Sequence, residues 1–238
     1  MNLPTHTDRS RALTLIEVMV IVACLSFLAV MMGLKLGEAK AKASRIKCIG
    51  NNKITGLGFR IWANDNDDRY PYRTPTRRDQ STGTTVPNVV YHNESDAWLY
   101  FVVMSNELGS SKMVMCPSDR ERRKYMATDF STASYGLQFL KNQAVSYFIG
   151  PAADETKPLV LLLGDRHMET NVSNVTGSLL TFTATNLPSW TASHHRYAGN
   201  ITLSDGSVQQ VSTPWLQTNA LAGLRSLGME TNRLLMPW

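Results

Sequence analysis

The chain has 238 residues, a hydrophobic content of 43% and a net charge of +5 at pH 7. This length accommodates one large domain or two small ones. The basic balance would suit an anionic partner, but the sequence has no arginine-rich tract or RNA-binding motif, so nucleic acid is not expected as the main partner.

The first predicted element is an apolar helix near the N-terminus. The stretch Val18–Leu34 carries no charge, and Leu13–Ile16 extends it, which is long enough to span a bilayer. It is too long for the apolar region of a secretory signal peptide. A lipoprotein signal ending at Cys24 is an alternative, but the chain stays apolar after Cys24, where a polar tether would be expected. We therefore predict a membrane-spanning helix over residues 13–35.

The start of this helix resembles the processing site of type IV prepilins and type II secretion pseudopilins. In "ALTLIEVMVIV" a small residue and an apolar residue precede Thr-Leu-Ile-Glu, after a short basic leader. The resemblance implies a leader peptide over residues 1–12, cleavage between Ala12 and Leu13, and N-methylation of Leu13. One position departs from the family, because most members have glycine where this chain has Ala12.

Glu17 is the unusual residue of the apolar stretch. A carboxylate in a membrane helix costs about 2.5–3.5 kcal/mol on insertion scales, so it normally marks a function or a partner. One interpretation is that Glu17 lies close enough to the helix start to reach the lipid headgroups. The family resemblance implies another, an assembly role in which Glu17 pairs with the new α-amino group of Leu13 inside a filament. The lysines and arginines after the apolar stretch favour the opposite membrane orientation by the positive-inside rule, and we follow the motif.

Residues 36–66 are predicted to continue the same helix in amphipathic form. Apolar residues recur there at spacings of three to five, which gives one stripe along the helix: Ile46, Ile49, Ile54, Leu57 and Ile61. The helix is expected to end within "ANDNDDRYP", because Asn and Asp favour turns and Pro71 prevents continuation. An EF-hand loop starting at Asp65 fails, since Tyr70 and Thr76 occupy its glycine and bidentate-acid positions.

Residues 67–238 are predicted to form a C-terminal globular domain. Pro71 to Asn93 is polar and indicates an exposed loop, while "AWLYFVVMS" is either a short helix or a strand. "AVSYFIG", "PLVLLLGD" and "SLLTFTAT" are predicted strands, and "NITLSDGSVQQVS" predicts a hairpin with a type I′ turn at Asp205-Gly206. The expected fold class is α+β, a long N-terminal helix packed on a small antiparallel sheet, as in type IV pilins.

Short motifs along the domain also resemble those of bacterial prepilin-like proteins. A helix-to-turn segment is followed by Cys-Pro-Ser-Asp, Ser-Tyr, Gly-Asp-Arg and finally a histidine nine residues before Asp-Gly. The matching positions here are Cys116 to Asp119, Ser146-Tyr147, Gly164 to Arg166, and His195 with Asp205 and Gly206. Each motif alone is weak, but the series occurs in order over most of the chain.

Two cysteines outside the apolar stretch, Cys48 and Cys116, are candidates for a disulfide. The alternative is that each is a small unpaired residue, because the sequence does not show whether their Cα atoms come within the roughly 7 Å that a bridge allows.

The histidines raise the question of a metal. His167, His194 and His195 could combine with Asp165 or Asp205, and calcium fits such oxygen donors better than zinc does, but anchoring of a loop is the more usual role of such a histidine. No nucleophile elbow, phosphate-binding loop, dinucleotide fingerprint or Cys-x-x-Cys pair is present, so neither an enzyme nor a resident cofactor is expected.

The resemblance implies a structural subunit of a type IV pilus or a type II secretion pseudopilus. Its expected partners are copies of itself, other pilins, prepilin peptidase and the inner-membrane assembly platform. Its expected location is the bacterial inner membrane, crossed once, with the C-terminal domain in the periplasm or outside the cell. The alternative is a membrane-anchored minor pilin that binds glycan, a secreted substrate or DNA, and an anchored enzyme comes third.

Overall fold

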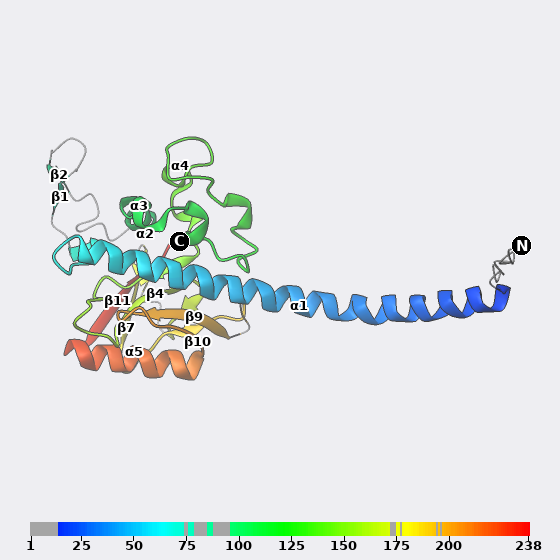
Figure 1. Ribbon diagram of the computed structural model, residues 1–238. Coiled ribbons are helices and arrows are strands. Elements are labelled where there is room, and N and C mark those ends of the chain that lie inside the picture. The colour runs from blue at the N-terminus through cyan, green and yellow to red at the C-terminus, as the bar shows by residue number, and fades with distance from the viewer. Residues whose placement is uncertain are drawn as a thin grey trace, which may run out of the picture. The chain divides into compact units, whose positions relative to one another are not determined.

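The structure is a computed structural model (Figure 1). It describes residues 14–73, 76–78, 85–87, 96–171, 175–176, 178–193, 195 and 197–238. The chain divides into two compact units, residues 1–43 and 44–238. The long helix α1 (Leu15–Asn64) contributes residues 15–43 to the first unit and residues 44–64 to the second.

Helix α1 begins and ends for local reasons. At its start the Glu17 carboxylate accepts hydrogen bonds from the Thr14 amide at 2.8 Å and the Thr14 hydroxyl at 2.9 Å, while the Glu17 amide donates to the Thr14 hydroxyl at 3.4 Å. This reciprocal pattern is a capping box. At the other end Asp67 and Asp68 adopt positive φ, which acidic and amide side chains tolerate best after glycine. The predicted stop before Pro71 is confirmed.

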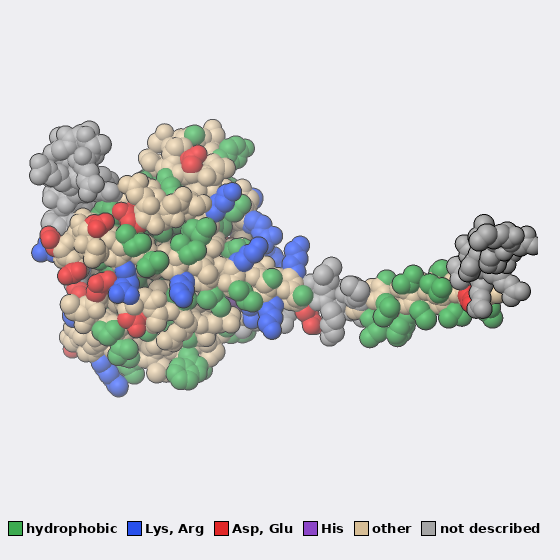
Figure 2. Space-filling model, in the orientation of Figure 1, with side chains coloured by type: hydrophobic (Ala, Val, Ile, Leu, Met, Phe, Trp, Pro, Cys, Tyr) green, Lys and Arg blue, Asp and Glu red, His purple; other side chains and the backbone are tan. Residues whose placement is uncertain are grey.

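In its described residues, 14–43, the first unit is the N-terminal part of α1 with Thr14 before it. Its side chains from residue 14 to residue 31 are all exposed, and most of them are apolar. Figure 2 shows these apolar side chains gathered along the helix. Among the residues that the structure describes, no helix combines the length and the apolar character needed to cross a membrane.

The second unit contains a seven-stranded sheet in which each pair of neighbours is antiparallel. The strand order is β10 (Val208–Ser212), β9 (Ala198–Leu203), β4 (Leu161–Asp165), β3 (Tyr147–Ile149), β11 (Thr231–Leu235), β7 (Leu179–Thr183) and β6 (Val175–Thr176). The expectation of an α+β fold with a long N-terminal helix and an antiparallel sheet is confirmed, as are the three strands predicted around β3, β4 and β7. Sequence reasoning did not identify β11 or helix α5 (Thr213–Leu227).

Shorter elements connect these parts. "AWLYFVVMS" forms a helix, α2 (Ala97–Val103). The predicted loop after Pro71 includes a pair of three-residue strands, and its remaining residues beyond Arg73 lie outside the described part of the chain. The elements not yet mentioned are η1 (Pro71–Arg73), β1 (Thr76–Arg78), β2 (Thr85–Pro87), α3 (Ser105–Leu108), η2 (Ser111–Val114), η3 (Arg123–Tyr125), α4 (Leu137–Leu140), η4 (Lys141–Ala144), β5 (Met168–Glu169) and β8 (Ser189–Trp190).

Two hydrophobic cores form in the second unit, on opposite faces of the sheet. Helix α5 covers one face, where its Leu216 and Leu224 join a cluster that includes Phe148 and Ile201. The second half of α1 covers the other face (Figure 1), with Phe59 and Trp62 buried in a cluster that includes residues of β3 and β4. Full burial of such large side chains contributes roughly 2–3 kcal/mol each.

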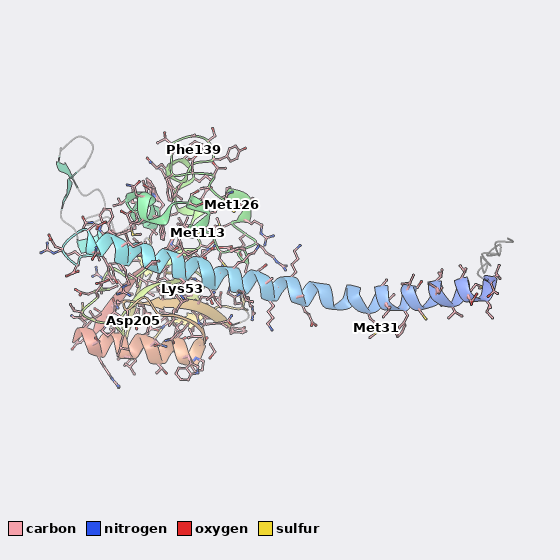
Figure 3. The ribbon with its side chains drawn as sticks, in the orientation of Figure 1. Met31, Lys53, Met113, Met126, Phe139 and Asp205 are labelled. Carbon is pink, nitrogen blue, oxygen red and sulfur yellow. A yellow bond between two sulfur atoms is a disulfide. The ribbon has the colours of Figure 1, made fainter. Side chains whose placement is uncertain are left out.

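The face that α1 presents to this core is not its aliphatic stripe. Ile46, Ile54, Leu57 and Ile61 are 61%, 44%, 55% and 42% exposed. Lys53, in the same part of α1, is exposed as well (Figure 3). The buried face instead carries small, polar and aromatic residues: Cys48, Asn52, Thr55, Gly56, Gly58, Phe59, Trp62 and Ala63.

The position of Gly56 gives the physical reason. A Cβ atom there would lie 2.8 Å from the Thr202 methyl group, so the helix approaches β9 more closely than any larger residue would permit. This close approach places Phe59 and Trp62 in the core, where aromatic side chains bury more area than isoleucine.

The β9–β10 hairpin is confirmed, but its predicted type I′ turn is wrong. Such a turn needs positive φ at both central residues, and of Asp205 and Gly206 only Gly206 has positive φ (+82°). The Gly206 amide donates to the Leu203 carbonyl, and the Leu203 amide donates to the Ser207 carbonyl, both at 2.9 Å. The turn therefore centres on Ser204 and Asp205, with Gly206 as the left-handed residue that follows.

Candidate functional site

The motifs that are scattered along the sequence meet near a disulfide. Cys48 on the buried face of α1 is bonded to Cys116, which follows η2. Their Cα atoms are 4.9 Å apart, and the two residues are 68 positions apart in the sequence. Both cysteines are fully buried. The disulfide joins the second half of α1 covalently to the start of the Cys-Pro-Ser-Asp segment.

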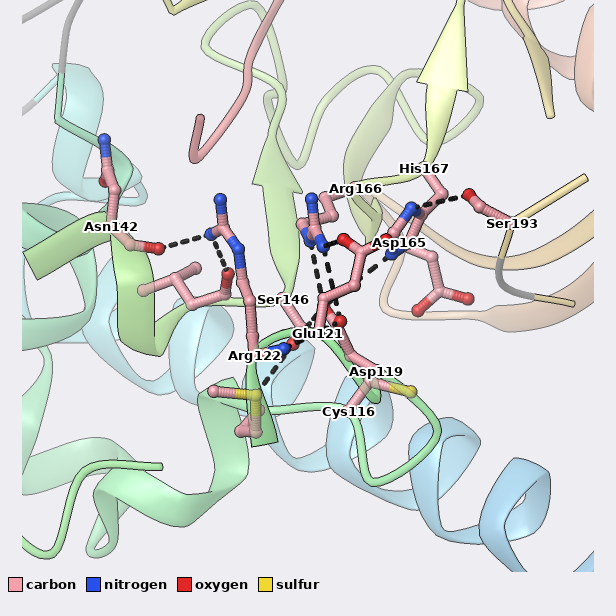
Figure 4. Close-up of polar contacts among 12 residues, drawn as sticks. Cys116, Asp119, Glu121, Arg122, Asn142, Ser146, Asp165, Arg166, His167 and Ser193 are labelled. Carbon is pink, nitrogen blue, oxygen red and sulfur yellow. Dashed lines mark hydrogen bonds and ion pairs between the residues drawn. The ribbon is translucent and has the colours of Figure 1, made fainter. Parts of the chain in front are cut away.

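Asp119, the last residue of that segment, lies at the centre of a buried polar network (Figure 4). Its carboxylate accepts hydrogen bonds from Arg166 Nε at 2.9 Å and Nη2 at 3.3 Å, and from the Ser146 hydroxyl at 2.9 Å. The Asp119 side chain is fully buried and that of Arg166 is 8% exposed. Arg166 also reaches the exposed carboxylate of Glu121 at 2.5 Å. Three motifs that the sequence placed far apart therefore share one ion-paired group.

Arg122 extends this network to the neighbouring loop. Its guanidinium donates to the carbonyl oxygen of Val145 at 2.6 Å and also to that of Asn142 (Figure 4). Burial, with the positive charge of Arg166 nearby, lowers the pKa of Arg122 to about 10. Arg122 thus holds the end of η4 against the Cys116–Asp119 segment, a role that no pattern in the sequence indicated.

Asp165, next to Arg166 at the end of β4, forms a second buried group. Its Oδ2 accepts hydrogen bonds from the Asn200 amide at 2.8 Å and from the Asn200 side chain at 3.0 Å, and lies 3.5 Å from His195 Nε2. Burial raises the pKa of Asp165 to about 7 and lowers the pKa of His195 to about 4. Arg45 of α1 donates to the His195 carbonyl at 3.0 Å, which ties this loop to the helix.

The histidine and the Asp-Gly of the last motif lie at different places. His195 precedes β9 and contacts Asp165, whereas Asp205 follows β9 at the hairpin tip. There the Asp205 carboxylate accepts from the Ser207 amide at 2.8 Å, and Arg60 of α1 donates to the Asp205 carbonyl at 3.3 Å. The two ends of this motif therefore attach to α1 separately, one through Arg45 and the other through Arg60.

In the part of the chain that the structure describes, two groups of side chains have spacings that a metal ion could use. Asp119, Glu121 and His167 place ligand atoms within 4.8 Å of one another. Calcium needs six to eight oxygen ligands, and here the Arg166 guanidinium already binds both carboxylates. This group therefore does not suit calcium, the cation that the sequence left open as an alternative. The other group is Cys48, Cys116 and His195. His194 lies outside the described residues.

The predicted processing and assembly residues belong to the first unit. Ala12 and Leu13 lie outside the described residues. Glu17 is exposed, and its hydrogen bonds are those of the capping box with Thr14. The Thr-x-x-Glu spacing could have revealed this cap from the sequence.

No protein-family model, curated protein or solved structure matches this chain.

Proposed function

We propose that this chain is a self-assembling structural subunit, a pilin or pseudopilin with a type IV pilin-like arrangement. The observation that carries the proposal is the first unit of the structure. It is a helix whose described side chains are exposed and mostly apolar, with Glu17 as the single charged residue from Thr14 to Met31. Such a helix has no core of its own to pack against, so lipid or a second protein chain must cover it.

Self-association supplies that cover without a different partner protein. Copies of the same helix present apolar surface from residue 14 to residue 31, and they can pack side by side once they leave the bilayer. The second unit has its own two cores, so it can be displayed from such a bundle without contributing to it. An exposed apolar helix joined to a separately packed unit supports a filament subunit more than a single-chain enzyme or carrier.

Glu17 has two roles to reconcile in this proposal. In a single chain it caps the helix through Thr14. In an assembly its negative charge would favour a cationic partner, and the α-amino group of a chain cut before Leu13 is mostly protonated at neutral pH, with a typical pKa of about 7.7–8.0. Pairing of the two charges in a low-dielectric bundle would set the register between subunits.

The remaining elements of the proposal follow from the sequence resemblance. Prepilin peptidase would cut between Ala12 and Leu13, Leu13 would be N-methylated, and the inner-membrane assembly platform would move the subunit into a pilus or pseudopilus with other pilins. The second unit would then lie in the periplasm or outside the cell.

A substitution at Glu17 separates capping from charge pairing. Glutamine at the same position keeps the capping box but removes the charge. We expect Glu17→Gln to be processed normally and to keep its helix content, but to lose filaments that sediment after shearing. Thr14→Val, which removes the cap and keeps the charge, serves as the matched variant and should retain filaments.

Mass spectrometry of the mature N-terminus is the second measurement. A chain that starts at methylated Leu13 supports the proposal, whereas an intact Met1 or a lipidated Cys24 contradicts it. A processed chain that never sediments as a polymer would instead support the membrane-anchored binding module.

A further inference from the structure

The cluster of Cys48, Cys116 and His195 lies in the second unit, outside the helical segment on which the proposed assembly rests. Their exposures are 0%, 0% and 2%, and a ring nitrogen of His195 lies within 4.8 Å of both sulfur atoms. The three residues come from α1, the segment after η2 and the loop before β9. We propose that, when the disulfide is reduced, these residues bind a thiophilic divalent cation of the zinc class.

The donor set matches the chemistry of zinc. Two thiolates and one imidazole form a Cys₂His set, with metal–ligand distances of about 2.3 Å to sulfur and 2.0–2.1 Å to nitrogen. Tetrahedral ligands at those distances are roughly 3.3–3.8 Å apart. The ring nitrogen already lies within 4.8 Å of both sulfur atoms, and the two bonded sulfur atoms must move apart to that range once the sulfur–sulfur bond opens.

Surrounding contacts hold each donor in place without the disulfide. Asp165 Oδ2 lies 3.5 Å from His195 Nε2. A small movement of the ring would form the carboxylate–histidine hydrogen bond that orients a metal-binding imidazole and leaves Nδ1 for the metal. Arg45 holds the His195 backbone, and Asp119, bound to Arg166, holds the segment that begins at Cys116. Cys48 is fixed by the helix itself.

The chemistry requires a dithiol reductant from the cell. The dithiol transfers two electrons and two protons to the Cys48–Cys116 bond, giving two thiols, and is itself oxidised to a disulfide. One divalent cation then replaces the two thiol protons, which pass to water, and binds both thiolates. The disulfide and the metal therefore exclude each other. The same residues would join α1 to the segment that begins at Cys116 covalently when oxidised and through a cation when reduced.

Cobalt binding tests this directly, because Co²⁺ bound to thiolates absorbs in the near ultraviolet. The full-length chain is prepared in detergent with Cys24→Ser, which removes the exposed third thiol. One half of the sample is reduced with a phosphine under anaerobic conditions, and the other half of the sample stays oxidised. We expect one Co²⁺ per reduced chain, displaced by Zn²⁺, and no thiolate band from the oxidised chain.

Variants distinguish this cluster from adventitious thiol binding. Cys48→Ser should abolish the thiolate band of the two-sulfur site, and Asp165→Asn should weaken zinc binding by about 10–100-fold. His195→Gln should also weaken binding, whereas His167→Gln, at a buried histidine outside the cluster, should not. Circular dichroism shows whether each variant keeps its fold.

The comparison of reduced and oxidised chain needs no substitution in the site, so it remains decisive if a variant misfolds. A reduced, folded chain that binds no Co²⁺ or Zn²⁺ would overturn the proposal, as would equal zinc affinity in folded His195→Gln. Neither result bears on filament formation, which is measured by sedimentation.

Discussion

The Arg166 guanidinium binds both carboxylate oxygens of Asp119, at 2.9 and 3.3 Å, inside the second unit. The two residues are 47 positions apart in the sequence, and their side chains are 8% and 0% exposed. Because Ser146 donates to the same carboxylate, one ion pair connects the Cys-Pro-Ser-Asp segment, the start of β3 and the end of β4. These three motif segments are thus attached to one another through one buried carboxylate.

Removal of Asp119 should destabilise the second unit strongly. Asp119→Ala leaves the Arg166 charge buried without its main partner, which typically costs about 3–5 kcal/mol of unfolding free energy. Glu121→Ala removes only the exposed partner and should cost no more than about 1 kcal/mol. Urea denaturation followed by tryptophan fluorescence measures both values, and equal losses from the two variants would contradict the central place of Asp119.

Loss of the disulfide should lower stability through the unfolded chain. The Cys48–Cys116 bond restricts a long loop, and removal of such a bond typically costs about 2–5 kcal/mol. We expect this loss in the double variant Cys48→Ala and Cys116→Ala, measured by urea denaturation with a chelator present. Cys24→Ser should leave the transition unchanged, because that cysteine is free and exposed.

Two glycines in different surroundings should respond to alanine with opposite signs. A Cβ at Gly164 would lie 2.6 Å from the Phe148 ring and 2.7 Å from the Asn200 carbonyl, so Gly164→Ala should cost about 1–3 kcal/mol. Gly50 lies inside α1 with no atom within 4 Å of an added Cβ, so Gly50→Ala should stabilise by about 0.5–1 kcal/mol. Thermal unfolding of both variants tests the contrast, and a stabilising Gly164→Ala would show that β4 and β9 are less closely packed than described.

Tyr70 should make the protein sensitive to alkaline pH. Its hydroxyl donates to the Ser204 carbonyl at 2.8 Å, and burial, with Glu155 nearby, raises its pKa well above the ordinary value of 10.0. Because the pKa is higher in the folded state, this stabilising contribution is complete below pH 10 and is lost as the pH rises further.

Tyr70→Phe removes the ionisable group, so the fall in unfolding free energy above pH 10 should become less steep. The same substitution should cost about 1 kcal/mol at neutral pH through the lost hydrogen bond. Tyr135→Phe, at an exposed ring, is the control and should change neither quantity. An unchanged alkaline slope in Tyr70→Phe would contradict the prediction.

Much of the secondary structure could be predicted because its causes are local. The capping box at Thr14, the turn residues before Pro71 and the strands rich in branched residues are all readable within a few positions. Helix α5 was not predicted, because its sequence shows no strong apolar periodicity. Pro214 near its start and Gly228 after its end are nevertheless typical helix boundaries. The sequence predicts a turn at Asp205-Gly206 correctly but assigns it the wrong type. The dipeptide alone does not show which two residues occupy the centre of the turn.

The candidate site was less accessible to sequence reasoning. The motif residues Asp119, Ser146 and Arg166 were identified in order, but nothing in their spacing showed that they share one ion pair. Three residues of the network belong to no motif in the series: Arg45, Arg122 and Asn200. Each forms its hydrogen bond only because folding brings a distant carbonyl or carboxylate within reach.

The sequence by itself determined where α1 begins and ends, where the main strands lie, and that the first part of the helix is apolar with one acidic residue. Only the tertiary structure decided which face of α1 meets the sheet, which cysteine and ion pairs form, and that Ile54 and Leu57 stay exposed. The physical reason is that helical spacing shows which residues share a face, whereas contact depends on how closely two surfaces fit. At Gly56 the close approach to Thr202 selects the face with Phe59 and Trp62 over the more aliphatic one.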